Sequence, residues 1–147
     1  MSKYQILKDF DDCYVHVCDL LGDKSTNNLQ LLNFGAFLFG DKFKSVYCAD
    51  DNIRLHNDQC CIVNTDPHTK SGTHWLGLYN YRNVYYVFDS FGRDVRKLSK
   101  FFKKKPWQNF EFHRIERFRS ENYLTILLSL TFLIIFDKYK LKCRGVI

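Results

Sequence analysis

A run of 14 residues without a charge, residues 123–136 ("YLTILLSLTFLIIF"), constrains the fold of this chain more than any other feature. A helix that spans a lipid bilayer needs about 20 apolar residues, so this run is short for a membrane span. A helix that is apolar on every side is more typical of a protein core. The run therefore predicts a central buried helix around which the rest of the chain packs, and a membrane anchor over residues 123–136 stays open as an alternative.

The composition is that of a folded chain. Its 147 residues are 46% hydrophobic and 17% aromatic, which excludes a disordered polypeptide and is enough for one sizeable core. No repeat or linker interrupts the sequence, so we expect a single domain over residues 1–147. The first residues are charged where a signal peptide needs an apolar run, so we expect a protein that is not secreted and whose cysteines stay reduced.

The charge is unevenly distributed. Residues 1–70 hold 7 basic and 10 acidic side chains, a net charge of −3, whereas residues 71–147 hold 15 and 6, a net charge of +9. The densest basic cluster, "RKLSKFFKKKPW", includes Lys103, Lys104 and Lys105. Basic residues interleaved with aromatic ones could form a weak contact with nucleic acid or with an acidic partner. A solvated helix face without any partner explains the same cluster.

The other segments show helix-like and strand-like patterns, which together predict an α+β fold. Residues 4–22 have apolar residues at helical spacing and end at a glycine, and the apolar residues 29–43 fit no single type. Strands are predicted over residues 59–66, 73–79, 84–90 and 110–118, and a short helix over residues 95–105. In the last strand, Phe110, Phe112 and Ile115 are expected to face inward.

A histidine and an aspartate lie on the two strands of the predicted hairpin, "THWLGLY" and "VYYVFDS". If the turn centres on residues 81–82, His74 lies directly opposite Asp89. If it centres on residues 82–83, the two become diagonal neighbours on the same face, and only a three-residue loop would separate them. We therefore predict that these two side chains lie within reach of each other.

Two interpretations of this pair remain open from the spacing. A carboxylate that binds one nitrogen of an imidazole fixes its tautomer and raises its basicity, so His74 and Asp89 could serve a nucleophile. A buried hydrogen bond that only satisfies two polar groups in a sheet gives the same spacing.

The stretch "CCIVNTDPHTKSGTHWLGLYNYRNVYYVFDSFGR", residues 60–93, resembles the centre of the adenovirus-type cysteine proteases, which also occur in large DNA viruses, virophages and Maverick/Polinton-type elements. The shared features are a Gly-Thr-His-Trp, an aromatic hairpin and a Phe-Asp-Ser-Phe-Gly. With weaker flanking similarity, the likeness covers about residues 30–137. It implies a mixed sheet whose hairpin carries His74 and Asp89 and packs on the central helix, as in adenain and SUMO proteases.

The resemblance implies a role for four residues. His74 matches the general base and Asp89 the acid that orients it. Glu116 falls where the family has the glutamine of the oxyanion hole, and Tyr123 falls where it has the nucleophilic cysteine.

The last two matches depart from the family in ways that oppose catalysis. The phenol of Tyr123 has a reference pKa of about 10 and is a poor nucleophile at neutral pH. An ionised Glu116 has no proton to donate to an oxyanion, and losing one such donor costs about 10² to 10³ in rate. We expect an inactive homologue, although an altered reading frame around "ENYLTILLS" would explain the same departures.

The remaining cysteines suggest neither a relocated nucleophile nor a metal centre. Cys60, Cys61 and Cys143 lie at positions that the family does not use. The motif "CYVHVC", with Cys13 and Cys18, is half a zinc site without a second pair of ligands, so we predict no metal and no other cofactor.

Taken together, the residues and the resemblance predict a homologue of a viral or mobile-element cysteine endopeptidase. Active relatives would process virion precursor polypeptides, so we expect a polypeptide partner and a location inside the host cell or the virion. The alternatives are a non-catalytic module that binds a polypeptide or nucleic acid, and a small protein anchored to a membrane by residues 123–136.

Overall fold

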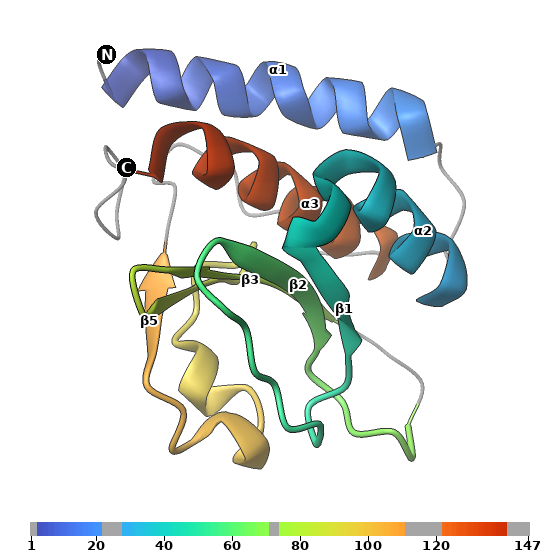
Figure 1. Cartoon of the computed structure of the whole chain (residues 1–147), viewed down its shortest axis with the longest axis vertical. Helices are drawn as coiled ribbons and strands as arrows, with labels where there is room; N and C mark the ends of the chain where they lie inside the picture. The colour runs from blue at the N-terminus through green and yellow to red at the C-terminus, as the bar shows by residue number, and fades with distance from the viewer. Residues whose placement is uncertain (1–2, 22–27, 71–73, 111–121, 141–147) are drawn as a thin grey trace.

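The computed structural model describes residues 3–21, 28–70, 74–110 and 122–140 (Figure 1). Its centre is a mixed sheet with the strand order β1-β2-β3-β4-β5. The outer pairs, β1–β2 and β4–β5, are parallel, whereas β2, β3 and β4 are antiparallel neighbours. The strands are β1 (Phe43–Tyr47), β2 (Gln59–Asn64), β3 (Trp75–Tyr81), β4 (Val84–Phe88) and β5 (Trp107–Phe110). The predicted α+β class is confirmed.

In the described part of the chain, three helices cover one face of this sheet: α1 (Lys3–Leu21), α2 (Asn28–Phe39) and α3 (Asn122–Tyr139). Figure 1 shows α3 between α1 and the strands. From Thr125 to Phe136 every residue of α3 is buried except the half-buried Ile134, which confirms the helix predicted from the uncharged run. No helix in the described part of the chain is both long enough and apolar enough to cross a bilayer.

The central strands are buried on both faces. Cys60 and Ile62 pack in the cluster under the helices, whereas the alternate residues Cys61 and Val63 pack against the opposite cluster. This second cluster lies under the loop after β1 and two short 3₁₀ turns, η2 (Val95–Lys97) and η3 (Lys100–Phe102). Alternation of side chains along a strand places neighbours on opposite faces, so both layers need apolar residues.

Gly77 sets how closely α3 approaches the sheet. A Cβ atom at this position would lie 2.8 Å from the ring of Phe132 and 3.0 Å from the carbonyl oxygen of Ser129. Both neighbours belong to α3, and one of them is backbone. The missing side chain therefore lets the helix pack directly on β3.

The hairpin has the second of the two predicted registers. Tyr81 pairs with Val84, and the two turn residues Arg82 and Asn83 have φ angles of +53° and +65°. Two consecutive residues in this left-handed region are typical of the type I′ turn, whose twist matches that of a hairpin. The backbone N–H of Arg82 also donates a 2.6 Å hydrogen bond to Asn57 Oδ1.

Three predicted segments differ from the structure. Residues 95–105 do not form one helix, because Ser99 is extended (φ −155°) and separates η2 from η3. The last strand begins at Trp107 rather than Phe110; Phe110 is buried, while Phe112 and Ile115 lie outside the described residues. Strand β1 was not predicted, since only its first residue is fully buried and its pairing contains an irregularity.

Candidate active site

His74 and Asp89 lie at the same end of the sheet, one residue outside the hairpin strands. His74 comes directly before β3 and Asp89 directly after β4. The pairing of Gly77 with Phe88, continued outward, makes the two residues diagonal neighbours on one face. His74 Nε2 and Asp89 Oδ1 are hydrogen-bonded, and the two side chains are only 10% and 1% exposed. The structure therefore brings together the pair that the sequence predicts.

Asp89 is held by a second residue as well. Arg93 donates hydrogen bonds to Asp89 Oδ2 from its backbone N–H at 2.9 Å and from Nε at 3.0 Å. Burial alone would raise the pKa of this carboxyl, but the hydrogen bonds from His74 and Arg93 outweigh burial and hold the pKa at about 2. The carboxylate is therefore ionised at neutral pH and fixes the orientation of the imidazole.

The other ring nitrogen of His74, Nδ1, makes no hydrogen bond with any residue that the structure describes. The ring of Phe91 packs beside the imidazole, with centroids 5.0 Å apart. The carbonyl oxygen of His74 accepts a 3.0 Å hydrogen bond from the backbone N–H of Thr65, which fixes the main chain next to β2. A rigid imidazole with one nitrogen bound to a carboxylate can use the other to accept a proton.

The beginning of α3 lies against the residue that follows His74. The backbone N–H of Trp75 donates to Thr125 Oγ1 at 3.2 Å, and Ser129 Oγ donates to the carbonyl oxygen of Trp75 at 3.1 Å. These two bonds attach the first turns of α3 to the start of β3. The positive end of a helix dipole is thus placed beside the His–Asp pair, where it favours an anion.

The two remaining predicted site residues fall where the structure says little. Tyr123 belongs to the first turn of α3, and its side chain lies outside the described part of the chain. Glu116 lies wholly outside it. Their assignments as the nucleophile and oxyanion positions stay predictions.

The cysteines of β2 are poorly placed to replace a nucleophile. Cys61 pairs with Leu78, which is about 13 Å along β3 from His74. Burial raises the pKa of Cys60 to about 12 and that of Cys61 well above its usual range. Because the thiolate is the reactive form, both thiols are inert at neutral pH. Burial likewise raises the pKa of Cys13, on α1, to about 11.

The segment that builds this site matches a known family. The family model described as adenovirus endoprotease matches residues 50–120, which include β2, the hairpin and the His74–Asp89 pair. Over these residues the chain is similar to the adenovirus endoprotease family. The α+β architecture is consistent with that fold. A comparison with curated proteins finds no match.

This match supports a protease-like function in general terms. The match ends at residue 120, three positions before Tyr123. The family match therefore covers His74 and Asp89 and stops short of Tyr123.

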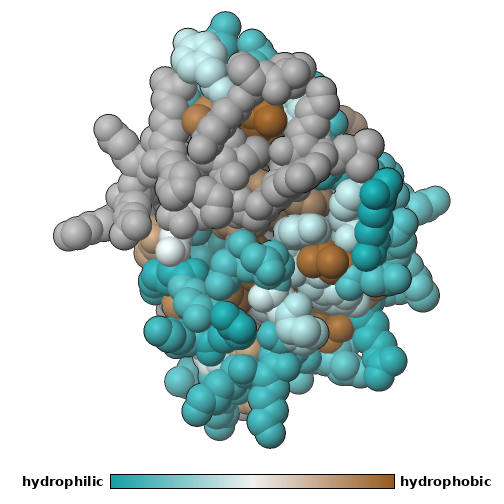
Figure 2. Space-filling model, turned by 90° about the vertical axis from the view of Figure 1, so that its left-hand side faces the viewer, coloured by the Kyte–Doolittle hydropathy of each residue, from teal (hydrophilic) through white to brown (hydrophobic). Residues whose placement is uncertain are grey.

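The predicted basic cluster is exposed but is not helical. Lys103 and Lys104 are exposed and Lys105 is half-buried, next to η3. A hollow of about 560 Å³ beside them is lined by six residues of the same segment: Asp94, Arg96, Lys97, Ser99, Lys100 and Lys103. Figure 2 shows a largely hydrophilic surface over the lower part of its face, towards the end of the molecule that carries η2 and η3 in Figure 1.

Two contributors to the site were missed from the sequence. Arg93 binds Asp89 from four residues further on, and Thr125 attaches α3 to Trp75. The basic residue that directly follows "FDSFG" was a signal for the first. No sequence pattern indicates the second, because it depends on how α3 packs.

Proposed function

We propose that this chain is a cysteine-endopeptidase homologue that keeps the base and the orienting acid and hydrolyses no peptide bond. In this proposal His74 is the base and Asp89 its orienter. The observation that carries it is the buried pair beside the start of α3, where the resemblance places Tyr123 instead of a cysteine. The proposal includes a single domain over residues 1–147 and a polypeptide partner.

The His74–Asp89 pair alone is insufficient for peptide hydrolysis. Peptide hydrolysis by a thiol protease needs a thiolate, which the helix dipole and an imidazolium stabilise together. A phenol at position 123 has a pKa about 1.5 units above that of a free thiol and gives a poor acyl carrier. Glu116 would add negative charge where an oxyanion forms. The retained geometry would then hold a polypeptide without cleaving it.

The first test is a comparison of activity between the chain and a restored variant. The chain is incubated with peptides and with a thiol-reactive probe, and we expect neither turnover nor rapid labelling. The double variant Tyr123→Cys/Glu116→Gln should be labelled at the introduced thiol and show peptide turnover. Adding His74→Gln to that variant should abolish both gains, because the base is then lost.

Turnover by the unaltered chain that disappears on replacing one of its own cysteines would contradict the proposal. A restored variant that folds, as judged by circular dichroism, but is labelled no faster than Cys13 would contradict the assignment of position 123.

A second candidate function is a weak contact with nucleic acid through Lys103, Lys104 and Lys105. The observation that favours it is the exposed basic surface around η2 and η3, which also carries the partly exposed ring of Phe101. Neutralising three phosphate contacts should lower the slope of log K against log salt by about 2 to 3. The triple Lys→Gln variant at these positions tests this by binding to DNA at several salt concentrations.

The matched control removes the same charge elsewhere, by glutamine at Lys8, Lys44 and Arg82, which are all exposed. An equal loss of affinity and slope in both triple variants would show that only the net charge matters, and would refute a site at residues 103–105.

A further inference from the structure

A second group of chemically active side chains lies at the same end of the sheet as His74. Cys48 directly follows β1, and the backbone N–H of Asp51 donates to its carbonyl oxygen at 3.1 Å to close a turn. His68 lies in the loop after β2, 17 residues from Asp51 in the sequence. A hydrogen bond of 2.9 Å from the backbone N–H of Ala49 to the carbonyl oxygen of Asp66 joins this turn to the loop after β2.

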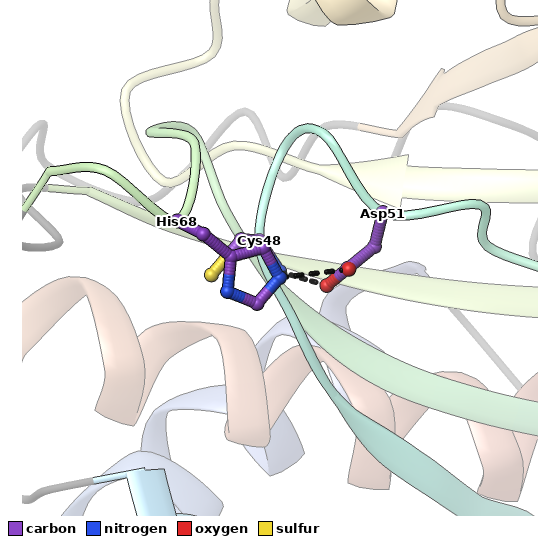
Figure 3. A group of neighbouring side chains, drawn as sticks. All are labelled: Cys48, Asp51 and His68. Atoms are coloured by element: carbon purple, nitrogen blue, oxygen red, sulfur yellow. Dashed lines mark hydrogen bonds and ion pairs between the residues drawn. The ribbon is translucent and has the colours of Figure 1, made fainter.

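The three side chains lie close together. One ligand atom each from Cys48, Asp51 and His68 (a sulfur, a carboxylate oxygen and a ring nitrogen) lie within 4.8 Å of one another. Figure 3 shows the imidazole of His68 with Asp51 on one side and the sulfur of Cys48 near the other. His68 Nε2 and Asp51 Oδ1 are 2.8 Å apart. The three atoms thus form a small triangle.

Backbone contacts hold two of these side chains in place. The N–H of Cys48 donates to Asp51 Oδ2 at 2.7 Å, so the carboxylate is fixed while its other oxygen faces His68. The N–H of His68 donates to Asp50 Oδ1 at 3.0 Å, which holds the loop against the turn. The carboxylate is therefore oriented before any ligand arrives, and the loop that carries the imidazole is held next to it.

We propose that Cys48, Asp51 and His68 bind one Zn²⁺ ion, with water in the fourth position. Zinc is a borderline-soft cation that accepts sulfur, nitrogen and oxygen together, and three protein ligands with one open position is a known zinc arrangement. Its bond lengths of about 2.0 to 2.3 Å place ligand atoms about 3.4 to 3.6 Å apart in a tetrahedron. His68, whose side chain is 60% exposed, has the freedom to make the small remaining movement.

Zinc binding accounts for the protons and charges of the cluster. The thiol of Cys48 releases its proton to solvent, and its sulfur, the carboxylate of Asp51 and the imidazole of His68 all bind the ion. The hydrogen bond between His68 and Asp51 is replaced by bonds from both residues to zinc.

The location gives the ion a structural consequence. Strands β1 and β2 run parallel, so Cys48 and the loop that contains His68 emerge at the same edge. That loop leads to His74, which is hydrogen-bonded through its carbonyl oxygen to Thr65. An ion between the turn and the loop would restrain the segment that carries the histidine of the candidate active site.

The motif that the sequence analysis considered and rejected as a zinc site behaves differently. Among the described residues, Cys13, His16 and Cys18 on α1 do not converge in this way, and Cys48, Asp51 and His68 do. Cys13 therefore provides a matched control for Cys48, since both are half-buried cysteines.

The experiment is a titration of the chelator-treated full chain with Zn²⁺ by calorimetry, and with Co²⁺ by absorption. We expect one equivalent of metal and a thiolate-to-cobalt charge-transfer band. Cys48→Ser should abolish the band and weaken zinc binding by at least about 100-fold, because even outer-shell changes cost 10- to 100-fold. His68→Asn should weaken binding similarly, and Cys13→Ser should leave both signals unchanged.

Several results would overturn the proposal. If zinc binding or the cobalt band survives in Cys48→Ser, the metal belongs to other cysteines. Loss of either signal in Cys13→Ser has the same meaning. No binding to the unaltered chain refutes the site directly. His68 lies on the surface, so a folded His68→Asn variant that binds zinc as tightly as the unaltered chain also refutes it.

Discussion

Two histidine–aspartate pairs lie at the same end of the sheet. They consist of the same functional groups but differ in burial and in the residues around them. His74 and Asp89 are buried, and Arg93 donates to the same carboxylate. His68 and Asp51 are 60% and 29% exposed in their side chains and have a thiol for a neighbour.

The difference shows what the surroundings add to one pair of groups. For Asp89, burial opposes ionisation, but donors from two residues reverse its effect and hold the pKa at about 2. For His68, a hydrogen bond with the Asp51 carboxylate raises the pKa of the imidazole at an exposed position. The buried pair is suited to hold one fixed geometry, and the exposed pair is free to exchange its hydrogen bond for another ligand.

The largest expected effect comes from breaking the buried pair. Asp89→Asn removes the ionised carboxylate that His74 and Arg93 bind, and the depressed pKa corresponds to about 2 kcal/mol of stability at neutral pH. Urea unfolding of this variant should show that loss. Asp51→Asn is the matched control at the exposed pair and should cost clearly less. Equal losses in the two variants would contradict the distinction between the pairs.

The pH dependence of stability sharpens the same comparison. The folded pKa of Asp89 lies below the unfolded value of about 3.9, so its contribution is complete above that value and is lost as the pH falls towards about 2. Unfolding followed from pH 6 to pH 2 should show this fall in the unaltered chain. The difference between it and Asp89→Asn should shrink over the same window, and a constant difference would argue against an ionised Asp89.

Removing the hydrogen bond that attaches α3 to the start of β3 should have a smaller effect on stability. Thr125→Val leaves the buried N–H of Trp75 without its acceptor, which we expect to cost about 1 to 2 kcal/mol. Thr131→Val is a control on the same helix, because Thr131 Oγ1 only donates to the carbonyl oxygen of Leu127 one turn earlier. Thermal unfolding would measure both, and a more damaging Thr131→Val would show that the bond to Trp75 is not important.

The smallest effect is expected for Arg93. Its side chain is 45% exposed, so Arg93→Gln should cost about 1 kcal/mol or less. It should nevertheless raise the pKa of Asp89, because it removes two of the side-chain donors. The acid limb of the stability profile should therefore move to higher pH, and an unmoved limb would show that His74 alone sets that pKa.

The sequence predicted those parts of the fold that depend on local pattern. The uncharged run predicted α3, and alternation in the hairpin placed His74 and Asp89 on one face in either two-residue register. The choice between registers was beyond sequence, because Arg82 and Asn83 are not a strong type I′ signature and yet adopt positive φ angles.

What the sequence missed depends on packing between distant segments. Strand β1 lacks a clear alternation and is defined by its parallel neighbour β2. The cluster of Cys48, Asp51 and His68 joins a turn and a loop that no periodicity connects. The helical pattern of residues 95–105 is interrupted by local side-chain caps. Asp94 accepts a hydrogen bond from the backbone N–H of Arg96, and Ser99 accepts one from the backbone N–H of Phe101, so two short turns form instead of one helix.

The glycine at position 77 has a consequence for anyone who tries to restore catalysis. The height of α3 above the strands is set there, because the missing side chain faces the ring of Phe132 and the main-chain oxygen of Ser129, about one to two helical turns beyond Thr125. The distance from the imidazole to a thiol introduced at the start of α3 would therefore depend on the spacing between α3 and β3 at Gly77. Any variant designed to introduce peptidase activity should therefore keep glycine at position 77.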